Sequence, residues 1–324
     1  SEKLKFILSY GILAPSGHNT QPWLFKIVDD TLELYLDKTR TLPVADPETR
    51  ESIISCGAAL FNLKIALRYF GLQDLVKVFP DEQKPDLLAK ISIGGVISPS
   101  NATKALFHAI VKRRTNRLPF TDHPLAPSLL SELQSLANSE YTQLQIIPKD
   151  SCEVVINLIT EGDRLQMANP HFRQELAQWI HSADNPRHDG IPTYAQGIDE
   201  RLDVFTPLIS LAIRSFDLGQ SQSAKDRKLA ATAPILVLLE SKNDTPQDWL
   251  ATGETLEHLL LRARVDDVWA SFFNQPIQIP ELRSRLKALI SHNTYPQILL
   301  RLGYGQDTKP TPRRPVNEVL QISH

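Results

Sequence analysis

Apolar residues recur along the chain with two spacings, one helical and one typical of strands. Recurrence every three or four residues indicates an amphipathic helix, and short apolar runs between turn residues indicate strands. A long helix is expected between Pro47 and Gly71, with Asp46 as its N-cap. Besides that helix, the first hundred residues are predicted to form a first helix, a β-hairpin and two later strands: Lys3–Ala14, Trp23–Val28 with Leu32–Leu36, Leu75–Phe79 and Ala89–Ile93.

A stretch rich in Gly, Pro and Ser, Gly94–Asn101, is the best internal boundary and divides the chain into residues 1–98 and 99–324. The second part again mixes helices and strands. Within it, Glu161–Lys228 is mostly helical and is expected to form a lid or insert. The other elements predicted in this part are the helices Lys104–Arg114, Pro127–Ala137 and Glu254–Phe272 and the strands Thr142–Ile147 and Pro234–Leu239.

A faint internal repeat relates the two long helices. When Ser55–Arg68 is laid over Ala251–Arg264, Gly57 meets Gly253, and two leucines and the final arginine also match. The repeat predicts two halves, each with a few strands and one long helix. Two copies of one fold pack around a pseudo-two-fold axis, as the subunits of a symmetric dimer do.

Composition excludes several classes of protein. The 324 residues carry 35 Lys and Arg against 37 Asp and Glu, which argues against a dedicated nucleic-acid binder. Two cysteines, Cys56 and Cys152, exclude a disulfide scaffold, and the nine histidines form no cluster with metal-ligand spacing. The apolar stretch Leu4–Ala14 is interrupted by polar residues and is far shorter than the roughly 20 residues of a membrane span. We therefore expect a soluble, cytoplasmic protein without metal.

Ala14–Trp23, with the sequence APSGHNTQPW, is the first of three segments that could carry chemistry. Pro15 and Gly17 bend the backbone, and the short side chains of Ser16 and Asn19 can bond the edge of a planar heterocycle. The same residues also suit an ordinary Ser or Asx turn that leads to a core tryptophan. From the residues alone, the ordinary turn is favoured.

The other two segments are basic. Lys112–Arg117, with the sequence KRRTNR, places four cations within six residues, and Arg313 and Arg314 stand between two prolines. Guanidinium groups suit bidentate contacts with phosphate. A solvated helix end, a basic tail and a nucleic-acid contact are the alternatives. A polar turn for a ring and cations for a phosphate together suit a phosphorylated flavin.

These segments resemble the nitroreductase family of flavin mononucleotide (FMN) oxidoreductases. Ala14–Trp23 matches the pattern A-P-S-x-x-N-x-Q-P-W, and Arg113–Arg117 is similar to the element R-R-S-x-R with threonine for serine. Asp46–Leu60 and the PTPRRPV ending are most similar to the Acg-type branch. The resemblance implies an α+β fold of two fused nitroreductase-like halves, each a mainly antiparallel sheet packed with helices around a long central helix.

The resemblance also implies an FMN site between the halves. One site per chain is expected, because the polar turn occurs only in the first half and the arginines only in the second. The counterpart of the turn, near Leu136–Ile147, has lost the motif. The residues implied to bind FMN are, for the ring, Pro15, Ser16, Gly17, Asn19, Arg117 and Ser271 (within Trp269–Gln275), and for the phosphate or ribityl chain Arg113, Arg114, Thr115, Arg313 and Arg314.

The implied activity is transfer of two electrons from NAD(P)H through FMN to a nitroaromatic, a quinone or a similar small acceptor. No side chain is singled out as a proton donor, and the protein is expected to be a monomer or a weak homodimer. An alternative is a flavin-sequestering protein in which the Glu161–Lys228 lid covers the ring. In that case Asp184–Gly197 would be a closing loop, with Tyr194 and Phe205 over the ring. A protein that has lost flavin altogether is a third possibility.

Overall fold

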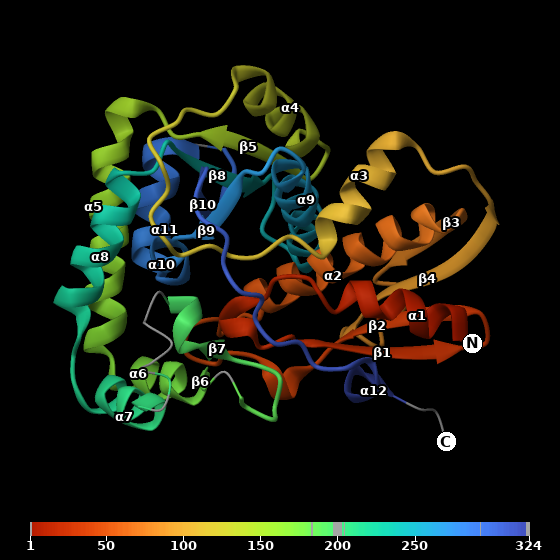
Figure 1. Ribbon diagram of the computed structural model, residues 1–324, viewed down its shortest axis with the longest axis horizontal. Helices are drawn as coiled ribbons and strands as arrows, with labels where there is room; N and C mark the ends of the chain where they lie inside the picture. The colour runs from red at the N-terminus through yellow and green to blue at the C-terminus, as the bar shows by residue number, and fades with distance from the viewer. Residues whose placement is uncertain (1, 183, 197–202, 204, 292, 322–324) are drawn as a thin grey trace.

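The computed structural model describes residues 2–182, 184–196, 203, 205–291 and 293–321. Two separate β-sheets are each packed with helices, and two long helices lie between the sheets (Figure 1). The α+β class expected from the sequence is confirmed. None of the described helices combines the length and the hydropathy that crossing a membrane requires.

The first sheet has the strand order β11-β1-β2-β4-β3 and comprises β1 (Trp23–Val28), β2 (Thr31–Leu36), β3 (Leu72–Val78), β4 (Leu87–Val96) and β11 (Leu320–Gln321). Its β1–β2 hairpin is the predicted one, and Trp23 and Phe25 are completely buried. Neighbouring strands are antiparallel except for β11, which pairs in parallel with β1. The end of the chain therefore returns to the sheet built by its beginning. Helix α1 (Glu2–Gly11) precedes this sheet, and α12 (Val316–Val319) precedes β11.

The second sheet has the order β5-β8-β10-β9 and is antiparallel throughout: β5 (Thr142–Ile146), β8 (Ile235–Ser241), β9 (Trp269–Phe272) and β10 (Tyr295–Gly303). Strands β1-β2-β4-β3 of the first sheet follow the same pattern, because in both sets of four strands the last strand along the chain lies between the second and the third. Strand β8 is buried along almost its whole length, as its apolar run predicted. Strand β10 was not predicted, although it is buried to the same extent.

The two long helices are α2 (Arg50–Tyr69) and α9 (Pro246–Val265), and both have 20 residues. Their bounds obey the same offset as the repeat found in the sequence. They cross where the two matched glycines meet. A Cβ on Gly57 would lie 2.1 Å from the carbonyl oxygen of Leu250, and one on Gly253 would lie 1.9 Å from that of Ile54. Only glycine allows this backbone contact.

Helix α2 begins at Arg50, three residues after the predicted start, because Thr49 has a left-handed backbone (φ 59°). Asp46 still caps it, since its carboxylate accepts hydrogen bonds from the backbone N–H of Glu51 (3.0 Å) and Ser52 (2.9 Å). The prediction for the second long helix was wrong at both ends. Helix α9 starts at Pro246 and stops before Asp266, and Trp269–Phe272 pairs with β10 as a strand.

An insert lies between β5 and β8 (Figure 1, green and teal, left and bottom). Helix α5 packs along α8, while α6 and α7 pack together near the first half. Residues Met167, Phe172 and Ile213 of the insert share a small core with Leu42 and Ala45 of the first half. The insert comprises α5 (Lys149–Ala168), α6 (Pro170–Gln178), β6 (Ile180–His181), β7 (Ile191–Pro192), a 3-10 turn (Thr193–Gln196), α7 (Thr206–Ser215) and α8 (Gly219–Ala231). The insert thus begins at Lys149, before Glu161, where the lid or insert was expected to start.

The remaining elements are short. Helix α3 ends at Ile110, before the predicted Arg114, so the arginine-rich segment lies in a loop. Helix α4 has the predicted bounds. These elements are η1 (Gly17–Asn19), η2 (Lys38–Arg40), α3 (Asn101–Ile110), α4 (Pro127–Ala137), α10 (Gln275–Gln278), α11 (Pro280–Leu286) and η5 (Lys287–Ser291).

Candidate functional site

Two adjoining cavities lie between the two sheets and the insert. The larger, about 650 Å³, is lined from the first half by the turn Pro15–His18 and by α2, and from the second by β9 and the insert. The smaller, about 80 Å³, is ringed by arginines. Pro15, Ser16, Thr115 and Arg117 line both cavities. A ligand with one bulky part and one small anionic part would fit this shape.

The turn before β1 has features of both an ordinary turn and a ligand-binding turn, the two possibilities that the sequence left open. Ser16 Oγ accepts a hydrogen bond from the backbone N–H of Gln21 (2.9 Å), and Trp23 is buried in the core, as in an ordinary turn. The same turn presents Pro15, Ser16 and Gly17 to the larger cavity. His18, Asn19 and Gln21 all have positive φ angles (50°, 55° and 54°). Such backbone strain in non-glycine residues is typical of functional sites.

Asn19 joins three parts of the chain. Its Nδ2 donates to the backbone oxygens of Gly190 (2.9 Å) and Pro312 (3.0 Å), and its Oδ1 accepts from Arg313 Nη1 (2.8 Å). The side chain lines the smaller cavity and not the larger one. Asn19 was predicted beside the ring, but it is placed where it holds Arg313 and the loop of the insert.

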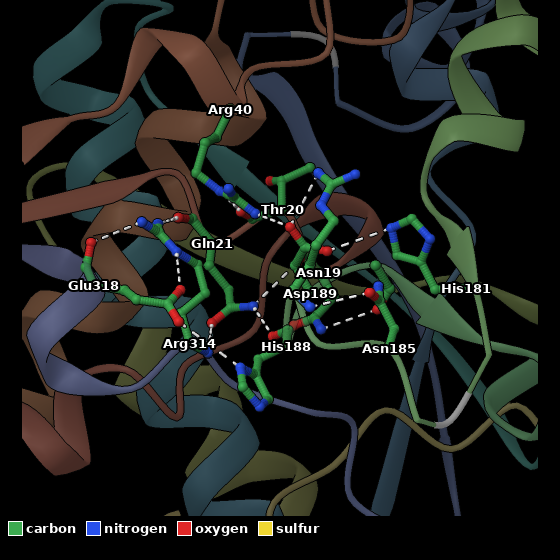
Figure 2. Close-up of polar contacts among 12 residues, drawn as sticks. Asn19, Thr20, Gln21, Arg40, His181, Asn185, His188, Asp189, Arg314 and Glu318 are labelled. Carbon is green, nitrogen blue, oxygen red and sulfur yellow. Dashed lines mark hydrogen bonds and ion pairs between the residues drawn. The ribbon is translucent and has the colours of Figure 1, made fainter.

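Gln21 makes a parallel set of contacts. Its Nε2 donates to the backbone oxygen of His188 (2.9 Å), and its Oε1 accepts from the backbone N–H of Arg314 (2.8 Å) (Figure 2). Nearby, the buried Asp189 pairs with Arg40 and with Arg187 (3.2 Å). The turn therefore fastens both the insert loop and the C-terminal segment to the first half.

Arginines from two distant segments meet at the smaller cavity. Arg113 donates to the backbone oxygen of Leu13 (2.9 Å), and Arg313 donates to that of Ala14 (3.2 Å). Arg114 lies beside Asp307 (3.0 Å) and Arg117 donates to Ala195 (3.2 Å), and both line the same cavity. Burial, with Arg113 nearby, lowers the pKa of Arg313 to about 9. This concentration of positive charge favours an anion.

Arg314 does not join this group. It lines neither cavity; its guanidinium lies 3.9 Å from Asp37 and 3.6 Å from Glu318 and donates to the backbone oxygen of Glu318 (2.9 Å) (Figure 2). Pro312 and Pro315 make the chain rigid, so that successive arginines point to different sides. The structure gives Arg313, and not Arg314, a place by the predicted phosphate.

A buried glutamate lies behind the arginines. Glu257 of α9 has no exposed surface, and its Oε1 is 3.4 Å from Arg113 Nε. Burial raises the pKa of Glu257 to about 7, although Arg113 and Arg313 oppose the shift. The sequence did not indicate this residue, because a glutamate in a helix is usually solvated.

The arginine loop is fixed to the second sheet. Thr115 pairs with Ala270 of β9, and the backbone N–H of Asn116 donates to the Ala270 oxygen (3.0 Å). Ser271, the next residue of β9, lines the larger cavity with Thr115 and Arg117. These three predicted residues are therefore brought together by a strand that was expected to be part of a helix.

The sequence did not indicate two further titratable residues of the larger cavity. Burial lowers the pKa of His18 to about 4, with the charge of Arg117 adding to the shift, so this histidine is neutral at pH 7. Glu51 accepts hydrogen bonds from Asn274 (3.2 Å) and Gln278 (3.0 Å), and burial together with Asp46 raises its pKa to about 7. His18 occupies a variable position of the motif, which is why the pattern gave no signal.

Part of the expected lid arrangement was wrong. Tyr194 donates to the backbone oxygen of Pro310 (2.7 Å) and Phe205 is 49% exposed; neither lines a cavity. The predicted closing loop, Asp184–Gly197, ends outside the described residues. Its part around Gly190 and Ile191 lines the smaller cavity. Apolar residues of α5, α6 and α7 form the insert's wall of the larger cavity instead: Met167, Phe172, Leu176, Ile209, Ala212 and Ile213.

The chain is similar to several known proteins. No family model matches the chain. It is 30% identical over 319 residues, 95% of this chain and 90% of the relative, to "Uncharacterized protein Rv3127" of Mycobacterium tuberculosis. It is 26% identical to "Putative NAD(P)H nitroreductase acg" of the same organism, over 99% of this chain and 96% of the relative. The chain belongs to the nitroreductase family, in its Acg-type branch.

Among solved structures, the chain is similar to the FMN- and NADPH-dependent nitroreductase NfnB from sphigopyxis sp. strain HMH. That similarity has 17% identity and a TM-score of 0.45, and covers 68% of this chain and 99% of that one. A second is NfnB from Mycobacterium smegmatis in complex with NADPH, with 15% identity, a TM-score of 0.43, and coverage of 69% and 100%. In the described part of this chain, His, Cys, Asp and Glu side chains form no group of three that could hold a metal ion.

Proposed function

We propose that the protein is an FMN-dependent oxidoreductase that carries two electrons from NAD(P)H to a small acceptor such as a nitroaromatic or a quinone. The observation that carries this proposal is the pair of joined cavities. An arginine-ringed pocket of about 80 Å³ opens beside a larger, mixed polar and apolar cavity of about 650 Å³. A flavin mononucleotide has the same division into one phosphate and one large ring.

The residues present fit this group. Within the described residues, the buried Nε atoms of Arg114 and Arg313 have no hydrogen-bond acceptor, and Arg113 Nε makes no hydrogen bond although Glu257 Oε1 lies 3.4 Å away. A phosphate could satisfy such donors with charge-assisted bonds. Four arginines and Lys309 line the pocket, and Glu257 and Asp307 are the carboxylates paired with two of the arginines, so the pocket carries an excess of positive charge that suits a phosphate.

Bound FMN would supply hydride chemistry, and the chain would supply orientation and charge. Arg113 and Arg313, with Thr115, would hold the phosphate end. Arg117, which lines both cavities, would stabilise negative charge that develops on the ring during reduction. Pro15 and Ser16 would border the ring from the first half.

We further infer that each chain holds one site, formed between residues 1–98 and 99–324. The matching strand orders and the crossing of α2 and α9 support a division into two related halves. The turn before β5, Asn138–Tyr141, corresponds in position to the turn before β1 and lacks its motif. The division is not strict, since β11 pairs with the first sheet.

A flavin-sequestering role is the second candidate, and the insert supports it. Met167, Phe172, Ile209 and Ile213 wall the larger cavity opposite the turn. If this wall fills the space in which a nicotinamide must stack, the protein would hold FMN without turnover.

An anaerobic titration separates the two candidates. Purified protein saturated with FMN is mixed first with NADH and then with NADPH, while the oxidised-flavin absorbance is followed. Rapid bleaching that a quinone reverses would support the enzyme. Bound flavin that resists both nicotinamides and yields to dithionite would support sequestration. Protein that takes up no FMN would refute both, and two FMN per chain would refute the single site.

A further inference from the structure

Two carboxyl groups of the insert face the larger cavity. Asp163 lies on α5 and Asp226 on α8, and the two residues are 3% and 7% exposed. The Nε2 atom of Gln275 donates to Asp163 Oδ1 (2.9 Å) and to Asp226 Oδ2 (2.9 Å). One amide nitrogen therefore holds both carboxyl groups close together.

The remaining oxygen of Asp163 points to a shared proton. Asp163 Oδ2 is buried and receives no hydrogen bond from the described residues. Each carboxyl group lies 2.9 Å from the same nitrogen, Gln275 Nε2. When two buried carboxyl groups are this close, repulsion between their negative charges disfavours the state in which both are ionised. Burial raises the pKa of Asp163 to about 8, and the charge of Asp226 adds to the shift. The pair therefore retains one proton at neutral pH, and Asp163 carries it.

Nearby positive charges favour the ionised form of Asp226. Burial raises the pKa of Asp226, and Lys225 of α8 and Arg301 of β10 oppose that shift. Arg117, whose own pKa Asp226 raises, belongs to the same group, and Gln222 donates to Asp226 Oδ2 (3.0 Å). Among the groups that shift the pKa of Asp163, Arg164 is the cation that lowers it.

The chain is shaped to bring Gln275 to this place. A Cβ on Gly162 would lie 2.7 Å from the Cβ of Gln275, so the absence of a side chain lets α10 approach α5. Three elements that are distant in the sequence thus assemble the pair at the cavity wall. A structural strut between α5 and α8 would not need a cavity beside it.

We propose that Asp163, in its pair with Asp226, donates the proton that an acceptor requires when it is reduced in the larger cavity. This inference rests on the proposed function and narrows its acceptor to conjugated carbonyl compounds whose oxygen gains a proton, such as quinones. Reduction of a quinone consumes one hydride, which NAD(P)H supplies, and one proton. The O–H bond of Asp163 breaks and an O–H bond forms on the quinone. The resulting carboxylate keeps its hydrogen bond to Gln275 and regains a proton from solvent.

The first test needs no cofactor. Infrared spectra of the protein are recorded from pH 5 to pH 9, and the carbonyl stretch of a protonated carboxyl is followed. We expect a band that disappears near pH 8 in the wild type, is missing in Asp163→Asn and titrates at lower pH in Asp226→Asn. Glu153→Gln is the matched control, because Glu153 also joins α5 to α8, through Arg227 on the exposed side. Glu51 and Glu257 contribute bands that disappear near pH 7 and remain in every variant. Persistence in Asp163→Asn of the separate band that disappears near pH 8 would overturn the proposal.

The second test separates proton transfer from electron transfer. Ferricyanide accepts electrons without a proton, whereas p-benzoquinone requires one. We expect the ratio of quinone turnover to ferricyanide turnover to fall about 100-fold in Asp163→Asn, as for loss of a general acid, and to stay unchanged in Glu153→Gln. An unchanged ratio in Asp163→Asn would refute the proton donor even if FMN binds. Failure to load FMN would refute the proposed function and leave the infrared result standing.

Discussion

The sheets β1-β2-β4-β3 and β5-β8-β10-β9 share one strand order, and each packs against a helix of 20 residues. Their connections differ. Asp29 and Asp30 join β1 to β2, whereas the whole insert joins β5 to β8. The strained turn stands before β1, while the arginine loop lies against β9. The frame formed by the two sheets and the two long helices is therefore nearly symmetric. The groups that line the cavities come from connecting segments that differ between the two halves.

The largest expected effect tests the symmetry of the frame. Gly57→Ala and Gly253→Ala would each place a Cβ within about 2 Å of a carbonyl oxygen of the opposite helix. We expect each change to lower the free energy of unfolding by about 3 kcal/mol, because neither helix can move away from the other without losing packing. Urea unfolding measures this. Gly95→Ala, where the nearest atom is 3.8 Å away, is the control. If the two variants lose different amounts of unfolding free energy, the two long helices do not contribute symmetrically.

The next prediction tests the asymmetry of the site. Arg113→Ala should raise the dissociation constant of FMN about ten- to a hundredfold, because a charge-assisted hydrogen bond is worth roughly 1.5–3 kcal/mol. Fluorescence titration with FMN gives the constant. Arg285, an exposed arginine paired with Glu161, supplies the control Arg285→Ala. Equal affinities for the two variants would remove Arg113 from the site.

A smaller effect compares the two corresponding turns. Asn19→Ala removes the bonds to Gly190, Pro312 and Arg313 and should lower the free energy of unfolding by about 2 kcal/mol. It should also weaken FMN binding through Arg313. Ser139→Ala, in the turn before β5, removes bonds to Tyr141 and Thr142 and should affect stability alone. Thermal unfolding with and without FMN distinguishes the two results. Loss of FMN affinity in Ser139→Ala would contradict the single site.

The smallest effect is a pH dependence. Glu257 has a usual pKa of 4.5 and a pKa of about 7 in the folded protein. The folded state therefore binds more protons across this range, and its stability falls as the pH rises from 4.5 through 7. Glu257→Gln should make this slope shallower in urea unfolding at several pH values. Glu254→Gln, on the same helix in a partly exposed pair with Lys64, should not. If Glu257→Gln leaves the slope unchanged, other titratable groups cause the pH dependence of stability.

Local signals account for the parts of the fold that the sequence predicted. The bounds of β1 and α4 match the predictions because clear turn residues flank regular patterns. The matched positions of Gly57 and Gly253 already predicted related helices. The predictions were wrong where the pairing between strands, and not the local pattern, decides whether a segment is a helix or a strand. Trp269–Phe272 continues a helical pattern, yet its hydrogen bonds are made with β10.

The sequence by itself determined which segments are candidates for a functional site. The motif around Ser16, the cluster Arg113–Arg117 and Arg313 are each recognisable locally, because turns and charge clusters depend on neighbouring residues. Only the tertiary structure decided which side chains face a cavity. Arg313 and Arg314 are adjacent in sequence but point to different places, and Glu257, Asp163 and Asp226 look like ordinary helix-surface charges. Burial sets their proton affinities, and burial depends on contacts between residues that are far apart in the chain.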